Sequence, residues 1–260
     1  MIEWKGKEYT KIWFTSDEHY GSDRHISLSK RLDFDNYLKY TKAEYIELKN
    51  ATDIPEGIKK MVVNTEYGMM LQQTPVDKMC NEIITKHNML VGENDLVIHI
   101  GDFGDYKYAE RLKGSHILMM GNYEHNYMND NYGGFTSTFR NEIITQYNFI
   151  DCMTELTLTT ELLHSMFSQH FVNEIGELYV THKPTDCRYN NSSNGNITPI
   201  ICDDGRLVMN LFGHIHEKQK VKTFGLNCGV DANHFYPVSQ EEIEFYIYAI
   251  LHYYDEDVFI

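Results

Sequence analysis

The chain has 260 residues, of which 42% are hydrophobic and 13% aromatic, and its formal net charge is −15 at pH 7. This apolar content is enough to bury one large core and argues against wholesale disorder, and no run of about 18 apolar residues suggests a transmembrane helix. The excess negative charge opposes binding to long duplex nucleic acid, which needs a basic surface.

Five short apolar runs, each followed directly by polar residues, mark out the chain. In order they are residues 11–14, 96–100, 116–120, 178–180 and 207–212. Runs of this length bounded by glycine and turn residues are typical of buried strands. Because ligands of open α/β sheets bind beyond the carboxyl ends of the strands, we expect the polar residues after these runs to meet in one site.

Helical periodicity fills the segments between several of these runs. It predicts helices at 75–87, 106–112 and 137–147, and a last helix to about 252 with Ser239 and Glu242 as its capping box. Strands and helices without an internal repeat predict one α/β domain over residues 1–260. We expect an insertion at about 26–74, and a loop at about 186–205, where Asn, Ser and Gly are abundant.

The residues at the strand ends are of the types that bind divalent metal ions. Three offer oxygen and four offer imidazole nitrogen: Asp17, Asp102, Asn122, His19, His182, His214 and His216. In Asp17-x-His19 and His214-x-His216, an extended backbone would turn both side chains to the same side. Nitrogen and oxygen ligands without thiolate suit manganese, with iron, zinc, nickel, cobalt or magnesium as alternatives. Seven ligands exceed the needs of one ion, so we expect two ions bridged by Asp102.

Five of these segments resemble the calcineurin-like metallophosphoesterases. They read FTSDEHYG at 14–21, GDFGD at 101–105, GNYEH at 121–125, THKP at 181–184 and GHIH at 213–216. A sixth, GLNCGVDANHFYPVS at 225–239, is similar to the C-terminal signature of a bacterial and phage-encoded branch of that family. The resemblance covers most of the chain except roughly residues 26–74.

The resemblance implies a fold, a ligand scheme and a reaction. The fold would be a four-layer α/β/β/α sandwich. Asp17, His19 and His216 would hold the first ion, Asn122, His182 and His214 the second, and Asp102 would bridge them. A metal-bridging hydroxide would then attack the phosphorus of a phosphate ester. The chain would thus be a metal-dependent phosphoesterase.

The chain departs from this family at residue 123. Most members carry a His there, after Gly-Asn, and that His is thought to protonate or steady the leaving group. Tyr123 replaces it in this sequence, and a phenol is a poorer acid at neutral pH than an imidazole. We therefore expect a phosphodiesterase acting on small nucleotide-like substrates, ahead of a phosphomonoesterase. His125 is a second candidate for the missing role, if the loop bends.

Other histidines and arginines receive weaker assignments. Arg24, His25 and Arg188 are candidates for contact with a substrate phosphate, although an ordinary surface position suits each of them as well. His99 and His116 lie inside apolar runs. We expect them to be core histidines with hydrogen-bond partners and not metal ligands.

Two further functions stay open from the sequence. One is a nuclease acting on DNA or RNA ends, which the net charge disfavours. The other is a binding or scaffold protein that keeps the fold without the chemistry, which the complete ligand set disfavours. The five widely spaced cysteines lack a Cys-x-x-Cys pair, and the N-terminus lacks a long apolar stretch. These features predict a cytoplasmic protein with no membrane partner.

Overall fold

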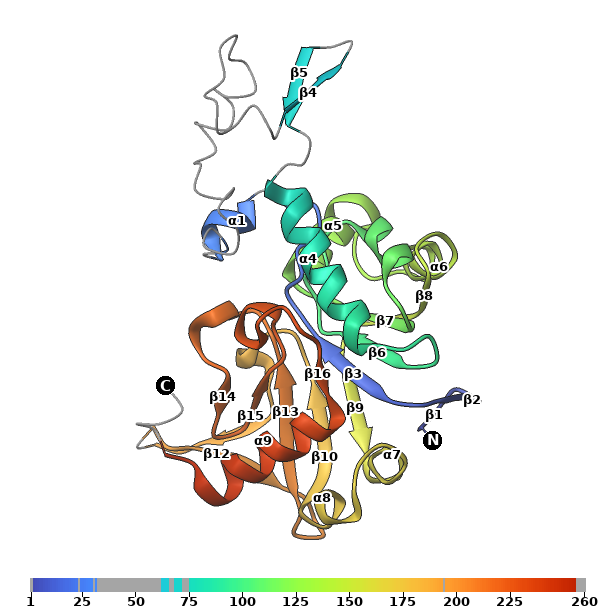
Figure 1. Ribbon diagram of the computed structural model, residues 1–260. Coiled ribbons are helices and arrows are strands. Elements are labelled where there is room, and N and C mark those ends of the chain that lie inside the picture. The colour runs from blue at the N-terminus through green and yellow to red at the C-terminus, as the bar shows by residue number, and fades with distance from the viewer. Residues whose placement is uncertain are drawn as a thin grey trace.

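The computed structural model of the chain describes residues 2–22, 24–29, 31, 62–65, 68–71, 75–193 and 195–255. Within these residues the fold is mixed α/β, with two main sheets (Figure 1). The first sheet has five strands in the order β16-β3-β6-β7-β8. Their bounds are Val238–Ser239 for β16, Ile12–Thr15 for β3, Leu96–His99 for β6, Ser115–Met119 for β7 and Phe149–Met153 for β8.

The five-stranded sheet is buried on both faces. Strands β3, β6, β7 and β8 run parallel, and β16 pairs antiparallel with β3. Along β3, Ile12 and Phe14 join the core shared with the other sheet, whereas Trp13 packs with Val91 and Val97 on the opposite side. Strands covered on both faces read as unbroken apolar runs, which explains why β3, β6 and β7 were visible in the sequence. Strand β8, interrupted by Asp151, and the two-residue β16 were not predicted.

Helices cover the outer face of this sheet (Figure 1). They are α4 (Pro75–Leu90), α5 (Asn122–Tyr132) and α6 (Ser137–Gln146). Their apolar residues, with Leu118 of β7 and Phe149 of β8, form a second core cluster. Met79 and Ile83 of α4 and Phe139 and Ile143 of α6 lie fully inside it, as their helical spacing requires.

The second sheet has seven strands in the described residues. The path β11-β12-β13-β10-β9 is extended by β15, which pairs with β13, and by β14, which pairs with β15. The bounds are Tyr189–Asn191 for β11, Ile197–Ile201 for β12, Leu207–Phe212 for β13, Ile175–Val180 for β10, Leu156–Thr159 for β9, Gly225–Asn227 for β15 and Val221–Lys222 for β14. Strands β10 and β13 are parallel, so their carboxyl ends lie at the same edge.

Three helices complete the packing around this sheet. Helices α7 (Thr160–Met166) and α8 (Gln169–Glu174) connect β9 to β10. Helix α9 (Gln240–Tyr253) follows β16 and contacts strands of both sheets. A short hairpin, β1 (Ile2–Trp4) with β2 (Lys7–Tyr9), adds Ile2 and Tyr9 to the shared core.

Most predicted elements match the structure in type, and one differs in kind. The helices predicted at 75–87 and 137–147 are α4 and α6, and the capping box of Ser239 and Glu242 is present at the start of α9. Residues Tyr106–Arg111 form a 3-10 helix, η3, capped by Leu112, instead of an α-helix. Runs of only a few residues commonly adopt this tighter form.

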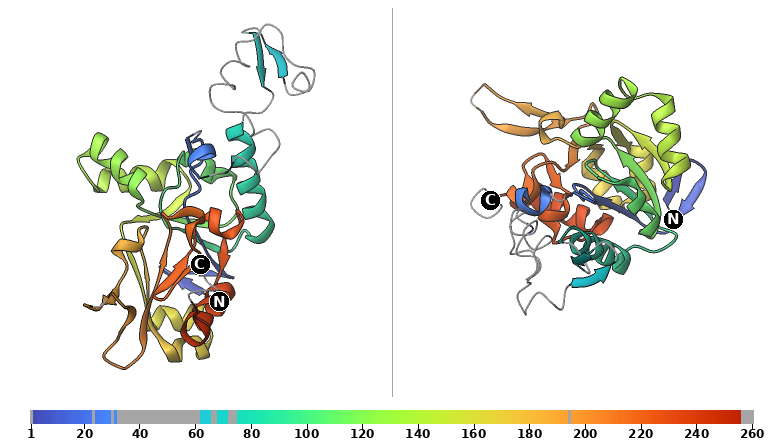
Figure 2. Two further views of the ribbon diagram at one scale, coloured as in Figure 1. Left: turned by 90° about the vertical axis from the view of Figure 1, so that its left-hand side faces the viewer. Right: turned by 90° about the horizontal axis from the view of Figure 1, so that it is seen from above.

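The segment predicted as a loop at 186–205 is mainly a β-hairpin. Strands β11 and β12 pair antiparallel, and β12 continues onto β13. Figure 2 shows the hairpin extending outward from the seven-stranded sheet. The prediction was wrong because the Asn, Ser and Gly residues belong to the exposed turn and the outer strand. Their abundance indicates exposure to solvent, but it does not exclude hydrogen-bonded strands.

The predicted insertion at 26–74 begins earlier in sequence than the structure supports. Ile26 is buried in the cluster beneath α4, and Ser29 and Arg31 are buried against residues near the strand ends. Helix α1 (Arg24–Leu28) therefore belongs to the main fold. Strands β4 (Val62–Thr65) and β5 (Gly68–Leu71) form a hairpin, and residues 30, 32–61, 66–67 and 72–74 lie outside the described residues.

No helix among the described residues has the length and apolar character needed to cross a membrane.

Candidate metal centre

The loops that follow β3, β6, β7, β10 and β13 meet at one edge of the two sheets. They carry, in that order, Asp17 and His19, then Asp102, Asn122 and His182, and finally His214 and His216. Two hydrogen bonds tie the sheets together at this edge. Nδ1 of His182 donates to the carbonyl oxygen of Ile100 at 2.8 Å, and the backbone N–H of His214 donates to Oδ2 of Asp17 at 2.8 Å.

The backbone at this edge is left-handed. Five of the seven expected ligands have positive φ: Asp17 at 60°, His19 at 51°, Asp102 at 55°, His214 at 72° and His216 at 51°. Non-glycine residues adopt this region in only a few per cent of cases, and each instance costs on the order of 1 kcal/mol. The prediction of an extended backbone at Asp17-x-His19 and at His214-x-His216 is therefore wrong. Tight left-handed turns direct their side chains inward instead.

Two glycines let the loops approach each other closely. A Cβ on Gly121 would lie 2.2 Å from Oδ1 of Asp102, and a Cβ on Gly213 would lie 2.1 Å from Oγ of Ser16 and 2.4 Å from Oδ2 of Asp17. No side chain fits at such distances. The glycines before Asn122 and His214 are thus required by the packing of the loops on the two aspartates.

The acidic and imidazole groups form three overlapping sets in which one atom of each residue lies within 4.8 Å of the others. The sets are His19 with His25 and His216, Asp102 with His182 and His214, and Asp17 with His19 and Asp102. Asp102 is shared by two of them. Its Oδ2 lies 3.3 Å from Nε2 of His182 and 3.8 Å from Nε2 of His19. Asn122 joins the second set through Oδ1, 3.1 Å from Nε2 of His182.

These groups fit a divalent cation. Oδ1 of Asp17 and Nε2 of His19 are buried without a hydrogen-bond partner, although buried polar atoms are normally paired. Burial raises the pKa of Asp17 and lowers that of His19 well below its usual value. Burial opposes a proton on His182, yet Asp102 and Asp17 together raise its pKa to about 9. The negative potential that holds this proton also favours a metal ion in its place.

Two of the histidines are oriented by partners behind them. The hydrogen bond from Nδ1 of His182 to Ile100 leaves Nε2 facing Asp102. Nδ1 of His216 donates to Oδ2 of Asp231 at 2.6 Å, and Asp231 in turn accepts from Arg31 at 2.7 and 2.8 Å. A carboxylate behind an imidazole fixes its tautomer and orientation for metal binding.

The sequence analysis missed Arg31 and Asp231. Arg31 is 2% exposed and also donates to the backbone carbonyls of Asp17 and Glu18 at 2.6 and 2.9 Å. It therefore braces the loop after β3 and orients His216 through Asp231. Arg31 was assigned to the insertion, and nothing in the local sequence separates it from a surface arginine. Asp231 lies within the 225–239 segment that carried the family resemblance.

Glu124 was also missed. It is 1% exposed, and its carboxylate accepts from the backbone N–H groups of Asp102, Gly121 and Phe103 at 2.8, 2.9 and 2.9 Å. It thereby joins the loop after β6 to the start of α5. An acidic residue in the third position of a helix is the sequence signal for such a capping role.

The candidates for leaving-group and substrate contacts separate in the structure. Tyr123 is half-buried at the start of α5, and its hydroxyl lies 3.2 Å from Nε2 of His25. The ring of His25 stacks on His19 with centroids 3.4 Å apart. Burial lowers the pKa of His25 to about 4. His125 and Arg24 are exposed.

Arg188 lies elsewhere, in contact with Glu177 at 3.3 Å and over the ring of Tyr179 at 4.1 Å. Its contacts lend no support to a role in binding substrate phosphate.

The two histidines expected in the core are there. His99 and His116 are fully buried, and Nε2 of His99 lies 3.0 Å from Nδ1 of His116. Nδ1 of His99 contacts the buried carboxylate of Glu18 at 2.6 Å. This prediction is confirmed.

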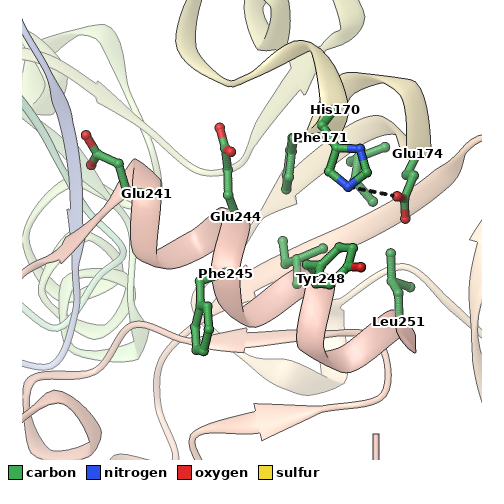
Figure 3. A pocket seen from close by; sticks show the side chains of 10 residues that line it. His170, Phe171, Glu174, Glu241, Glu244, Phe245, Tyr248 and Leu251 are labelled. Carbon is green, nitrogen blue, oxygen red and sulfur yellow. Dashed lines mark ion pairs between the residues drawn. The ribbon is translucent and has the colours of Figure 1, made fainter. Parts of the chain in front are cut away.

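A separate pocket lies between α8 and α9 (Figure 3) and is lined by none of the seven expected ligands. Its walls include the apolar side chains of Phe171, Phe245 and Leu251. Its carboxylates are engaged locally, as Glu244 accepts from Ser168 and Glu174 pairs with His252. It brings together no set of groups suited to metal binding or catalysis.

Comparisons with known proteins add little. No family model matches the chain, and no curated protein matches it. Among solved structures, the chain is similar to the protein of unknown function AQ665 from Aquifex aeolicus, at 15% sequence identity and a TM-score of 0.46. The match covers 91% of this chain and 99% of that one. A likeness at this level carries no argument about function.

Proposed function

We propose that this chain is a dinuclear metal-dependent phosphodiesterase of the calcineurin-like metallophosphoesterase superfamily, with small nucleotide-like esters as substrates. The corresponding architecture is the four-layer α/β/β/α sandwich. The sheets with helices outside them are compatible with that arrangement, and the order of the ligand-bearing loops follows the family motifs.

The observation that carries the proposal is the combination of backbone strain and unpartnered ligand atoms at one edge. Five expected ligands have left-handed backbones, and Oδ1 of Asp17 and Nε2 of His19 are buried without partners. Strain and unpaired polar atoms both cost stability, and among the described residues only Asp17 and His19 combine the two. Bound cations would supply the missing partners of the buried atoms, and the free energy of that binding would offset the strain of the turns.

Each residue has a role in this scheme. Asp17, His19 and His216 would hold one ion, Asn122, His182 and His214 the other, and Asp102 would bridge them. The pair would supply a nucleophile at neutral pH and neutralise charge on the phosphate. Asp231 and Arg31 would keep His216 in place, and Glu124 would fix the backbone around Asp102.

The preference for diesters rests on Tyr123. An ester with a good leaving group, such as an aryl oxygen or the phosphate oxygen of a nucleotide, needs less protonation of that oxygen than an alkyl monoester does. A phenol at this position suits the first class better than the second.

The test is a substrate screen with the manganese-loaded chain. It compares p-nitrophenyl monoesters and diesters, cyclic nucleotides, cyclic dinucleotides and short oligonucleotides, with and without a chelator. We expect diester hydrolysis that the chelator removes and that Asp102→Asn abolishes. Manganese binding without turnover of any ester would contradict the enzyme and favour a binding protein. Cleavage confined to oligonucleotides would identify a nuclease instead.

A further inference from the structure

We infer that Ser22, His25 and Tyr123 form a hydrogen-bond chain that presents the Tyr123 hydroxyl as a donor to a phosphate oxygen of the substrate. His25 is then a positioning residue, because it acts through Tyr123. The inference rests on the proposed function and adds to it the group that stands where the family's His is missing.

The hydrogen bonds connect Ser22 to His25 and His25 to Tyr123, which lies beside the candidate metal ligands. Oγ of Ser22 lies 2.9 Å from Nδ1 of His25, and Nε2 of His25 lies 3.2 Å from the hydroxyl oxygen of Tyr123. The ring of Tyr123 stands edge-on to His19, with centroids 5.0 Å apart. Its backbone N–H donates to Oδ1 of Asp102 at 2.9 Å. Tyr123 is thus fixed at its backbone by the expected bridging ligand and at its hydroxyl by His25.

The direction of donation follows from the chemistry of the three groups. A neutral imidazole donates from one ring nitrogen and accepts at the other. If the Ser22 hydroxyl donates to Nδ1, then Nε2–H donates to the Tyr123 oxygen, and the phenolic hydrogen is free to donate. A phosphate offers only acceptors, so a bound phosphate selects this arrangement. No change of protonation is involved.

The stacking of His25 on His19 argues against a competing role for His25 as a ligand of the same ion as His19. The two rings are parallel within 4° and their centroids are 3.4 Å apart. Imidazole lone pairs lie in the plane of the ring, so two rings stacked in this way point their nitrogens alongside each other and not at a common ion. The stack instead holds His25 rigidly beside Tyr123.

The experiment measures the binding of inorganic phosphate to the manganese-loaded chain by titration calorimetry, with manganese affinity measured separately. The variants are Tyr123→Phe, His25→Ala, their double variant and His25→Gln, which keeps an amide N–H donor. Tyr127→Phe, on the same helix but 44% exposed, is the control. We expect Tyr123→Phe and His25→Ala each to weaken phosphate binding about tenfold, the usual effect of losing a hydrogen bond to a charged group.

The double variant tests whether His25 and Tyr123 act through the same hydrogen bond. The double variant should bind no more weakly than Tyr123→Phe alone, because His25 acts only through the Tyr123 hydroxyl and has no effect once that hydroxyl is gone. His25→Gln should recover most of the affinity, and manganese affinity should not change. Additive losses, phosphate binding by Tyr123→Phe equal to that of the unaltered chain, or manganese affinity lost in His25→Ala would each overturn the inference. Because phosphate binding is read without turnover, this pattern would support the chain of hydrogen bonds even if no ester were hydrolysed.

Discussion

Two histidine-rich regions lie next to each other in this fold and differ in whether the ring nitrogens have hydrogen-bond partners. At the edge that carries the candidate metal ligands, His19 has a left-handed backbone and a buried Nε2 without a hydrogen-bond partner. In the core, His87, His99 and His116 lie within α4, β6 and β7. Both ring nitrogens of His99 and His116, and Nε2 of His87, contact a backbone carbonyl, Glu18 or one another. Neighbouring residues divide between the regions, because Glu18 faces the core while Asp17 and His19 face the edge.

The comparison teaches that residue type alone does not mark a metal site. Both regions contain buried histidines near carboxylates. Burial lowers the pKa of His87 and His99 to about 3. At the edge burial also lowers the pKa of His19, but aspartates raise the pKa of His182 and His216 despite burial. A site for a cation is recognised by uncompensated negative potential and strained backbone together.

The largest effect should come from disturbing the close packing at the edge. Gly213→Ala would place a Cβ against Ser16 and the carboxylate of Asp17. A ligand displaced by about 1 Å costs on the order of 100-fold in rate, so we expect a loss of ester hydrolysis at least that large, measured as kcat/KM. The control is Gly92→Ala, whose Cβ would meet Asp95 at an ordinary 3.4 Å. Equal losses in both variants would contradict a specific role for Gly213.

A smaller effect is expected from the carboxylate behind His216. Asp231→Asn keeps the shape but removes the charge that holds Nδ1 of His216 and the guanidinium of Arg31. Changes of this kind typically weaken metal binding about 10- to 100-fold, which calorimetry with manganese would measure. Asp151→Asn is the matched control, since the side chain of Asp151 is 2% exposed against 4% for Asp231 but pairs with Lys5 and Arg140. Unchanged manganese affinity in Asp231→Asn would remove Asp231 from the site.

The buried core histidines should make the free energy of unfolding decrease at acidic pH. The pKa of His87 is about 3 in the folded chain against 6.5 for the free side chain, so between these values the unfolded chain binds more protons. The free energy of unfolding is therefore unaffected by His87 above about pH 6.5. It decreases as the pH falls from 6.5 towards 3, because protonation of His87 favours the unfolded chain. By pH 5 the loss is about 2 kcal/mol relative to pH 7.5.

His87→Gln should remove that part of the pH dependence. Urea unfolding at pH 5 and pH 7.5 measures it, and His170→Gln, exposed on α8, serves as the control. If His87→Gln and the unaltered chain lose the same stability on acidification, His87 is not the proton-sensitive group.

The smallest effect is expected at His125. This residue is exposed in the first turn of α5, two residues beyond the Tyr123 that His25 already holds. His125→Ala should lower kcat by less than the roughly 100-fold or more that a general acid contributes, and more on esters with poor leaving groups than on activated aryl esters. Equal reductions on both classes would exclude a role as an acid.

The grouping of the candidate metal ligands at one edge was predictable from the sequence, because the signals for it are local. Each candidate ligand comes directly after a strand of one of the two main sheets. The apolar run of the strand and the polar residues after it were therefore visible together in the sequence. The capping box of Ser239 and Glu242 was also readable, because its two partners are three residues apart.

The parts that escaped prediction depend on contacts between distant residues. Arg31 reaches Asp231 across 200 positions of sequence, and no local pattern announces such a pair. The hairpin at 189–201 was read as a loop because its outer strand is exposed and polar. The left-handed turns at Asp17 and His214 were read as extended, because spacing by two residues has the same appearance in both conformations.

The left-handed backbones also bear on how this chain can change over evolutionary time. Asp, Asn and His are the non-glycine residues that tolerate this conformation best, so the requirements of the turns and those of metal binding select the same few amino acids. Asp17→Asn or Asp102→Asn would satisfy the turn while removing the charge that a cation needs. A single nucleotide change can therefore convert such a site into a metal-free one without unfolding the protein, which makes loss of chemistry far easier than loss of shape.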